Sequence, residues 1–260
     1  MTDRLQHARD QLATSFGYRK VRAEDKSALV GSVFERVATR YDLMNDLMSG
    51  GMHRLWKATM VDWLAPRPGL HLLDVAGGTG DIAFRVLDRI ARKSGPKSHI
   101  TVCDINPAML QVGRDRALDQ NRLNTFTWLC ADAEALPMRD RSVDAYTIAF
   151  GIRNVTRIER ALTEARRVLR PGGRFLCLEF SQLQWQALRG LYDQYSFRVV
   201  PWLGDQVADD RAAYQYLVES IRRFPDQDAF AGMIEQAGMG RIRFRNLSGG
   251  IVALHSAWRI

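Results

Sequence analysis

The stretch Leu72-Leu73-Asp74-Val75-Ala76-Gly77-Gly78-Thr79-Gly80-Asp81 joins a short apolar run to three glycines, and a segment of helical character follows it at residues 82–91. This order predicts a strand, a tight loop and a helix. Glycine has no Cβ and tolerates positive φ, so Gly77, Gly78 and Gly80 permit a sharp turn and a close approach of the backbone to a ligand. Amides at the start of the helix would point toward that ligand. The stretch therefore predicts a binding site for a nucleotide cofactor.

Two classes of cofactor fit the glycine loop. Residues 78–83, Gly-Thr-Gly-Asp-Ile-Ala, match the dinucleotide pattern of glycine, one residue, glycine, two residues and then glycine or alanine. Asp104 ends the next apolar run, where both classes place a carboxylate that accepts hydrogen bonds from ribose hydroxyls. The loop and Asp104 thus leave a nicotinamide dinucleotide and S-adenosylmethionine both open.

Length and composition indicate one globular domain. The chain has 260 residues, 46% of them hydrophobic and 25% charged, which suits one α/β domain with elaborations. No run approaches the ~20 apolar residues that span a bilayer, so a lipid substrate would be reached from the membrane surface. The net charge of +8 suits a nucleic acid, an anionic membrane or an anionic substrate, and does not decide among them.

Cysteine and histidine usage points to a reducing compartment without a metal site. Cys103, Cys130 and Cys177 lie in or at the end of apolar runs without pairing, so we expect small buried hydrophobic side chains. The five histidines show no metal-ligand spacing, and we expect no metal. Asp3 and Asp10 argue against an acid-poor transit peptide, which favours a cytoplasmic protein.

The periodicity of the chain separates an arm from a domain. Residues 1–25 are polar and aperiodic, which predicts a flexible N-terminal arm, and residues 26–260 form a single domain. Within it, residues 26–65 carry apolar side chains at helical spacing and predict an N-terminal helical cap. Residues 182–240 are rich in aromatic residues and predict a helical insertion, which either forms a lid over an apolar substrate channel or packs into the core.

Between the cap and the insertion, strand-like and helix-like segments alternate. This order predicts an α/β fold with a parallel sheet, helices on both faces and ligands at the carboxyl ends of the strands. Two final runs around Gly249-Gly250 predict an antiparallel hairpin. We expect strands at residues 70–75, 100–104, 125–130, 143–150, 174–180, 241–246 and 251–258, and helices at residues 82–91, 107–118, 158–169, 214–222 and 226–236.

Three features favour S-adenosylmethionine. Asp132 and Ala133 follow the third strand, where a carboxylate can accept the adenine amino group and a small residue lets the ring lie flat. Residues 168–174, Val-Leu-Arg-Pro-Gly-Gly-Arg, form a helix end, turn and strand start typical of class I methyltransferases, and the hairpin would complete their sheet. Residues 60–260 thus resemble a class I S-adenosylmethionine-dependent methyltransferase, with a Rossmann-like seven-stranded sheet and a C-terminal antiparallel hairpin. Such loops usually have glycine at the position of Ala76, and alanine is tolerable there if its φ is negative, so this departure bears on the geometry of the loop more than on the cofactor.

A more specific resemblance is carried by residues 41–57, 76–81, 149–156 and 216–221. Through these motifs the chain, from about residue 28 to the C-terminus, is similar to the UbiE family of ubiquinone/menaquinone biosynthesis C-methyltransferases. Residues 173–181 resemble the family in a version close to its mitochondrial branch, and we expect a bacterial enzyme of that lineage. The family implies methylation of a ring carbon of a polyprenylated quinol, either 2-methoxy-6-polyprenyl-1,4-benzoquinol or demethylmenaquinol.

The resemblance also implies the site residues. Arg153, Asn154 and Tyr41 would be catalytic: Arg153 stabilises phenolate charge or polarises a water that takes the proton, because a guanidinium stays protonated, and Tyr41 and Asn154 orient ring oxygens. The family's pattern places Ala149 in the cofactor pocket. The full set expected to bind S-adenosylmethionine is Gly77, Gly78, Thr79, Gly80, Asp104, Asp132, Ala133 and Ala149.

Partners and alternatives follow from the same comparison. The family implies a homodimer, association with other quinone-biosynthesis enzymes and a cytoplasmic location at the inner face of the membrane. A nucleic-acid substrate is disfavoured, because residues 150–155 lack the Asn/Asp-Pro-Pro-aromatic motif common in base-modifying methyltransferases. The alternatives are a methyltransferase for another small aromatic or lipid substrate, a nicotinamide-dependent reductase and a non-catalytic binding module.

Overall fold

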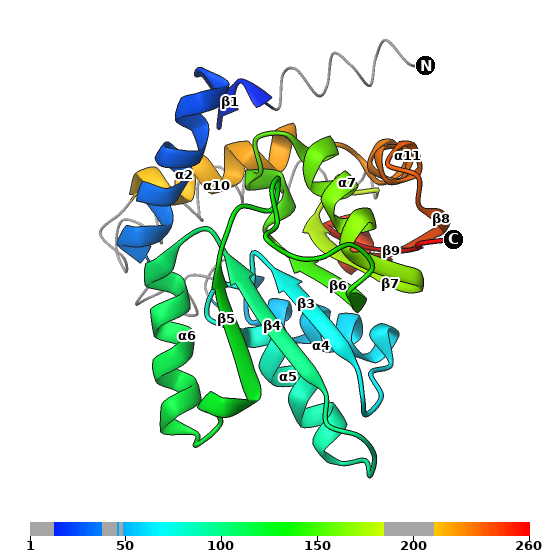
Figure 1. Cartoon of the computed structure of the whole chain (residues 1–260). Coiled ribbons are helices and arrows are strands. Elements are labelled where there is room, and N and C mark those ends of the chain that lie inside the picture. The colour runs from blue at the N-terminus through cyan, green and yellow to red at the C-terminus, as the bar shows by residue number, and fades with distance from the viewer. Residues whose placement is uncertain (1–12, 38–45, 47–48, 185–210) are drawn as a thin grey trace.

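The computed structural model describes residues 13–37, 46, 49–184 and 211–260, and these ranges contain a seven-stranded sheet with helices on both faces (Figure 1). The strand order is β5-β4-β3-β6-β7-β9-β8, in which β9 runs antiparallel to β7 and β8 and the other pairs are parallel. The predicted sheet and its C-terminal antiparallel hairpin are therefore confirmed. The strands are β3 (His71–Val75), β4 (His99–Asp104), β5 (Phe126–Cys130), β6 (Val143–Ala149), β7 (Leu169–Phe180), β8 (Gly240–Leu247) and β9 (Val252–Trp258).

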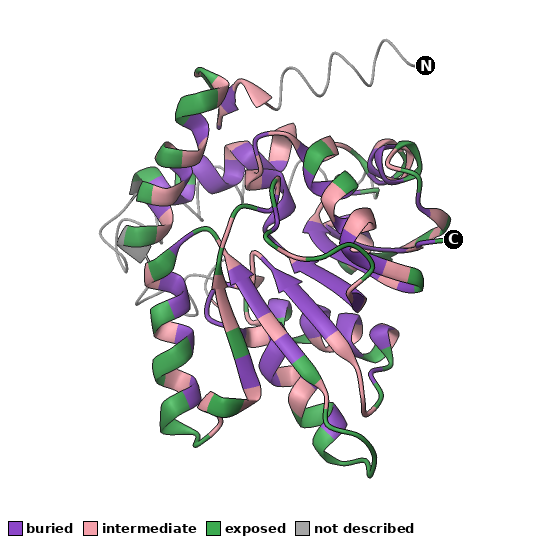
Figure 2. Cartoon of the chain, in the orientation of Figure 1, coloured by how far each residue is buried: buried purple, intermediate pink, exposed green. Residues whose placement is uncertain are grey.

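Alternating side chains of the strands feed two apolar cores, one on each face of the sheet (Figure 2). On β7, for example, Leu176 and Leu178 enter one core and Phe175 and Cys177 enter the other, as the two-residue period of a strand requires. The first core is covered by α4 (Met52–Leu64), α5 (Asp81–Ala91) and α6 (Pro107–Asp119), and the second by α7 (Ile158–Val168) and α11 (Gln227–Gln236). Among the described residues no helix is long and apolar enough to cross a membrane.

Local signals explain where the helices begin and end. The Asn106 side chain accepts hydrogen bonds from the backbone amides of Ala108 (2.9 Å) and Met109 (3.3 Å), and Pro107 follows at the first helical position of α6. The expected helix 158–169 ends one residue early and β7 begins five residues before the predicted strand, because the backbone of Leu169 already pairs with Val143 of β6. The remaining boundaries lie within a few residues of the predicted ones.

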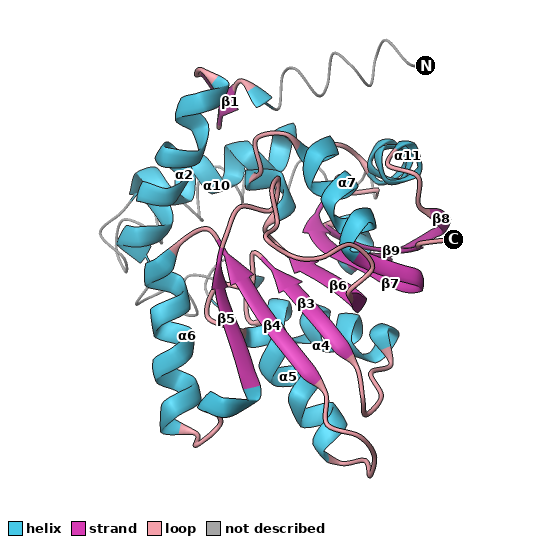
Figure 3. Ribbon diagram, viewed as in Figure 1, coloured by secondary structure: helices cyan, strands magenta, loops and turns pink. Residues whose placement is uncertain are grey.

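The segment before the domain differs from the sequence expectation. Residues 13–25, predicted as part of a flexible arm, contain the short strands β1 (Ser15–Phe16) and β2 (Arg19–Lys20) and the start of α2 (Ala23–Val37) (Figure 3). Their order comes from contacts far along the chain, on α10 (Arg211–Arg223). Phe16 stacks on Tyr216 at 4.3 Å between ring centroids, and the Tyr18 amide donates to Glu219 at 2.8 Å. Residues 1–12 lie outside the described ranges.

The predicted helical insertion is divided in the structure. Residues 185–210 lie outside the described residues, so the aromatic part of the proposed lid is not placed. The later part contains α10, which packs on α2, and α11, whose Phe230 and Ile234 are fully buried in the core that also holds α7. In the described part, α11 therefore belongs to the core and α10 to the N-terminal cap.

One of the three cysteines departs from its predicted environment. Cys103 and Cys177 are buried, as expected, whereas Cys130 is exposed. Cys130 ends β5, which is the edge strand of the sheet and has a neighbouring strand on one side only. The prediction that all three cysteines are buried is wrong for this edge position.

Candidate active site

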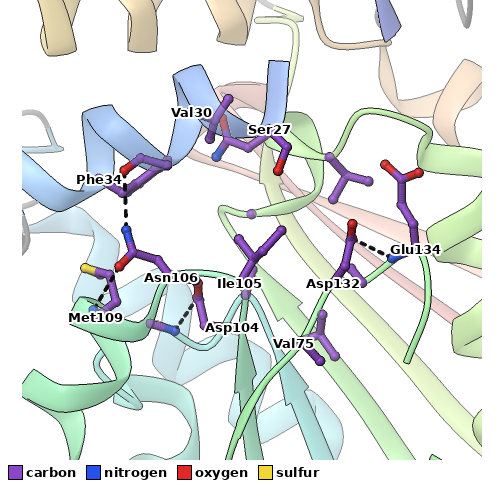
Figure 4. A pocket seen from close by; sticks show the side chains of 18 of the residues that line it. Ser27, Val30, Phe34, Val75, Asp104, Ile105, Asn106, Met109, Asp132 and Glu134 are labelled. Atoms are coloured by element: carbon purple, nitrogen blue, oxygen red, sulfur yellow. Dashed lines mark hydrogen bonds between the residues drawn. The ribbon is translucent and has the colours of Figure 1, made fainter. Parts of the chain in front are cut away.

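The larger pocket opens at the carboxyl ends of the parallel strands. β3 pairs with β4 on one side and with β6 on the other, so the connections leave in opposite directions and open a crevice between them. The pocket holds about 820 Å³ of empty space, part of it open to solvent. Side chains from the ends of β3 and β4 form its floor and the helix α2 lies across its top (Figure 4).

Asp104, at the end of β4, has carboxylate oxygens whose geometry matches a ribose. Its Oδ2 accepts a hydrogen bond from the Gly78 amide at 2.8 Å, and its Oδ1 accepts one from the Asn106 amide at 2.9 Å. Burial raises the pKa of the Asp104 carboxyl, while these amides favour its charged form. Each carboxylate oxygen can accept a second hydrogen bond, so two neighbouring ribose hydroxyls match the acceptors that Asp104 presents to the pocket.

The next side of the pocket suits a flat heterocycle. Asp132 is exposed in the pocket wall, and its Oδ1 accepts from the Glu134 amide at 2.9 Å, which fixes the carboxylate after β5. Ala133 beside it is buried. Ile105 is 46% exposed and lies between Asp104 and Asp132 (Figure 4), where it offers an apolar surface to a ring. The structure thus brings together Asp104, Asp132 and Ala133, as the sequence predicts, and adds Ile105.

A smaller hollow of about 340 Å³ adjoins the pocket and shares Ala76 and Gly78 with it. Asp74 is buried in its wall. The Thr147 hydroxyl donates to Oδ1 of Asp74 at 2.7 Å, whereas Oδ2 has no hydrogen-bond partner among the described residues. Burial raises the pKa of the Asp74 carboxyl to about 7. Predicted cofactor-binding residues Gly77, Thr79 and Ala149 also line this hollow.

Lys57 and Asp81 form an ion pair that lines the smaller hollow. Lys57 Nζ donates to Asp81 Oδ2 at 2.8 Å, and Arg85 Nε donates to Asp81 Oδ1 at 2.8 Å. Burial alone would raise the pKa of Asp81, but the charges and hydrogen bonds of Lys57 and Arg85 lower it to about 2. The hollow therefore combines a buried carboxylate, of which one oxygen has no donor among the described residues, with a lysine that can donate again.

The two hollows together fit S-adenosylmethionine. The larger pocket offers acceptors and an apolar surface for adenosine. In the smaller one, the unpartnered oxygen of Asp74 matches an ammonium group, and Lys57 matches a carboxylate. A buried carboxylate oxygen without a hydrogen-bond donor is costly, so a ligand ammonium beside Asp74 Oδ2 would relieve that cost on binding.

The loop that separates the hollows has the close contacts that glycine permits. A Cβ on Gly77 would lie 2.7 Å from Val102 Cγ1 and 3.0 Å from the Asp74 carbonyl oxygen, and Gly80 has a φ of 81°. Ala76 does not meet the condition of a negative φ, because its φ is 49°. Ala76 can take this left-handed conformation because its Cβ fills the space beside Gly151, where a second Cβ would come within 2.3 Å.

Arg153 follows β6 and is buried beside the pocket, but it is not one of the residues that line either hollow. Its Nη1 donates to Glu179 Oε1 at 2.7 Å and to the Phe150 carbonyl oxygen at 2.6 Å, and its guanidinium lies over the Phe180 ring at 5.5 Å. Its Nε is buried without a hydrogen-bond partner among the described residues. Arg153 therefore holds the chain after β6 in place and keeps one donor available.

Asn154 does line the larger pocket, at the end of the short helix η3 (Ile152–Asn154). The Tyr216 hydroxyl of α10 donates to Asn154 Oδ1 at 2.9 Å. Burial raises the pKa of Tyr216, so this hydroxyl stays a donor at physiological pH. Tyr216 thereby fixes the orientation of the Asn154 amide. Tyr41, the third predicted catalytic residue, lies outside the described residues.

Several site residues were absent from the sequence prediction. Asp74 and Lys57 lie in stretches that the sequence singles out, but only the fold joins them in one hollow. On α2, Val30 and Phe34 line the pocket, although their helical spacing predicts core packing. Glu179 could be recognised as the partner of Arg153 only once β6 and β7 are known to be neighbouring strands. Gly80 lines neither hollow among the described residues; it caps the start of α5.

The ionisation of Asp74 predicts how cofactor binding depends on pH. A ligand ammonium pairs with the charged carboxylate, so affinity for S-adenosylhomocysteine should rise about tenfold between pH 6 and pH 8, as expected for a group with a pKa near 7. Asp81, with a pKa of about 2, does not titrate in this range. Titration calorimetry of the wild type and of Asp74→Asn measures the effect, and the variant should bind more weakly with a flat profile.

A matched ligand controls for other titrating groups. 5′-Methylthioadenosine keeps the nucleoside but lacks the amino-acid end, so its affinity should not follow the ionisation of Asp74. An equal pH dependence for both ligands, or a profile that Asp74→Asn leaves unchanged, would contradict the assignment of Asp74 to the ammonium.

The sheet order, the glycine loop and the two adjoining hollows define a class I S-adenosylmethionine-dependent methyltransferase. Solved structures with the same fold include an S-adenosylmethionine-dependent methyltransferase from Aquifex aeolicus (TM-score 0.54, 15% identity, 75% of this chain and 84% of that chain). Another is a possible histamine N-methyltransferase from Thermotoga maritima (TM-score 0.60, 18% identity, 89% of this chain and all of that chain). At these identities the likeness concerns the fold alone.

The chain belongs to the ubiE/COQ5 methyltransferase family, whose model matches residues 9–259. It is 61% identical over 247 residues to the ubiquinone/menaquinone biosynthesis C-methyltransferase UbiE of Paracoccus denitrificans, which covers 95% of this chain and 97% of the relative. The protein of the same name from Brucella abortus is 56% identical over 248 residues, or 95% of this chain and 91% of that protein. The resemblance seen in the sequence motifs is confirmed.

Proposed function

We propose that this chain transfers the methyl group of S-adenosylmethionine to a ring carbon of a polyprenylated quinol. The substrate is 2-methoxy-6-polyprenyl-1,4-benzoquinol, demethylmenaquinol or both. The observation that supports this most strongly is identity of 61%, across 95% of the chain, with a relative named as a C-methyltransferase of ubiquinone and menaquinone biosynthesis. The pocket that offers acceptors for adenosine, and that Asn154 also lines, is consistent with this proposal.

The bound cofactor supplies an electrophilic methyl group. The protein must hold the reduced ring beside it, assist loss of a proton from a ring hydroxyl and exclude water. We assign the orientation of a ring oxygen to the Asn154 amide, because Tyr216 fixes it at the pocket wall. Tyr41 is proposed as a second contact to the ring.

Arg153 is proposed to act next to this site in two ways. Through Nη1 it holds the Phe150 carbonyl and Glu179, which fixes the turn that carries Asn154. Its buried Nε is a donor for a water molecule or for a ring oxygen that develops negative charge. A guanidinium does not give up its proton in proteins, so Arg153 stabilises charge and does not act as the base.

We also propose a location and an assembly. A polyprenyl tail resides in a bilayer, and the net charge of +8 would attract anionic headgroups, which supports peripheral contact with the inner face of a bacterial membrane. Homodimerisation and association with other quinone-biosynthesis enzymes are proposed from the family alone.

Complementation tests the proposal. A bacterial strain without its own quinone C-methyltransferase accumulates demethylated quinones, and expression of this chain should restore the methylated forms in lipid extracts measured by mass spectrometry. The variant Asp104→Ala provides the inactive control. Persistent demethylated quinones, with the protein folded and the cofactor bound, would contradict a quinol substrate and favour a methyltransferase for another small aromatic or lipid molecule.

A further inference from the structure

The helix α2 covers the pocket in which adenosine is expected to bind. Ser27, Val30 and Phe34 of α2 line the pocket from above, facing Asp104 and Asn106 on the floor (Figure 4). Val30 and Val33 of α2 also pack with apolar residues of α10. A cofactor in this pocket would therefore be enclosed between the sheet and α2.

Lys26 makes one of the polar contacts that join α2 to the segments following the sheet strands. Lys26 is 2% exposed, and its Nζ donates to the Val155 carbonyl oxygen at 3.2 Å. Burial lowers the pKa of Lys26 to about 8, and the charge of Glu134 acts in the opposite direction. A further contact joins the Asn106 side chain to the Gly31 carbonyl oxygen at 3.4 Å.

The groups around Lys26 belong to two segments that form the site. Val155 directly follows Asn154, which lines the pocket. Glu134 lies two residues after Asp132 and accepts a hydrogen bond from the Arg157 amide at 2.8 Å, which ties the segment after β5 to the segment after β6. Lys26 thus stands where α2 meets the adenine-binding segment and the segment that carries Asn154.

We propose that Lys26 is a positioning residue that fastens α2 over the bound cofactor and holds the segments of Asp132 and Asn154 in their binding arrangement. The inference rests on the cofactor in the proposed function and not on the identity of the methyl acceptor. Burying the Lys26 amine costs desolvation free energy. An apolar side chain at this position would avoid that cost, but it would leave the Val155 carbonyl oxygen without this donor.

Binding of S-adenosylhomocysteine to three lysine variants tests the role of Lys26. Lys26→Met keeps an unbranched side chain of nearly the same length and removes the donor, and Lys26→Arg restores a donor. Lys20→Met makes the same change at an exposed lysine of β2. We expect titration calorimetry to give a dissociation constant at least tenfold higher for Lys26→Met, within threefold of wild type for Lys26→Arg, and unchanged for Lys20→Met.

Hydrogen exchange distinguishes a local effect of Lys26 on α2 from a general loss of stability. With the ligand bound, amides of residues 23–37 should lose their ligand-induced protection in Lys26→Met, while those of β4 and α6 keep theirs. Wild-type affinity in Lys26→Met, or an equal loss of protection throughout the chain, would overturn the proposal. If Lys26→Met does not fold, Lys26→Gln is measured in its place by the same criteria. A chain that binds the ligand in this way and methylates no quinol would contradict the proposed function and leave the role of Lys26 intact.

Discussion

Replacing Arg153 with methionine is expected to lower the free energy of unfolding by about 3–5 kcal/mol and to abolish methyl transfer. The side chains of Arg153 and Glu179 are 4% and 1% exposed, and removing one partner of such a pair leaves an uncompensated buried charge. The loss of the hydrogen bond to the Phe150 carbonyl adds to the effect. Denaturant unfolding followed by circular dichroism measures the change.

The pH dependence of the free energy of unfolding of Arg153→Met shows whether the unpaired Glu179 causes the loss of stability. Burial already raises the pKa of Glu179, although Arg153 opposes this shift, and without Arg153 the raised pKa would lie further above the unfolded value. A group with a raised folded pKa destabilises the fold at pH values above its unfolded pKa, so the deficit of the variant should shrink as the pH falls from 8 to 5. A deficit independent of pH would contradict a role of the unpaired Glu179.

A double variant separates stability from chemistry. Arg153→Met with Glu179→Gln removes both charges and should recover most of the lost stability, while methyl transfer stays absent because no guanidinium remains beside Asn154. Substantial activity in the double variant would show that the ion pair is purely structural.

Replacing Asp104 with alanine is expected to weaken the binding of S-adenosylhomocysteine at least 100-fold. The carboxylate accepts the amides of Gly78 and Asn106, so its removal leaves these donors unpaired and takes away the acceptors for the ribose. Lost hydrogen bonds to a charged group are worth about 1.5–3 kcal/mol each, and about 1.4 kcal/mol corresponds to a factor of ten.

Titration calorimetry measures this loss against a matched control. Asp119→Ala removes an exposed carboxylate at the end of α6 and should leave the dissociation constant unchanged. If Asp104→Ala bound the ligand as well as Asp119→Ala, the pocket after β4 would not be the ribose site.

Local patterns were sufficient to predict the sheet and to place several of the residues that line the pocket. Apolar runs of strand length and the glycine loop place β3 and its neighbours, and parallel strands bring their carboxyl ends together, so Asp104 and Asp132 could be expected in one pocket. The hairpin at residues 15–20 could not be predicted, because its order comes from Tyr216, some 200 residues further along the chain.

The parts of the site that escaped prediction depend on tertiary contacts. The partner of Arg153 is Glu179 on the neighbouring strand, and sequence patterns do not state which side chains meet at strand ends. The left-handed conformation of Ala76 depends on the space beside Gly151. Val30 lines the pocket from a helix whose apolar spacing is equally consistent with core packing.

The most direct test of the account is transfer of a labelled methyl group from S-adenosylmethionine to a short-tailed demethylated quinone, with reduced and oxidised substrate compared side by side. Loss of a proton from a hydroxyl of the reduced ring makes a ring carbon nucleophilic, so the account predicts label on that carbon with the quinol and none with the quinone. Absence of label on both the reduced benzoquinol and the reduced naphthoquinol, with cofactor binding demonstrated in the same sample, would contradict it.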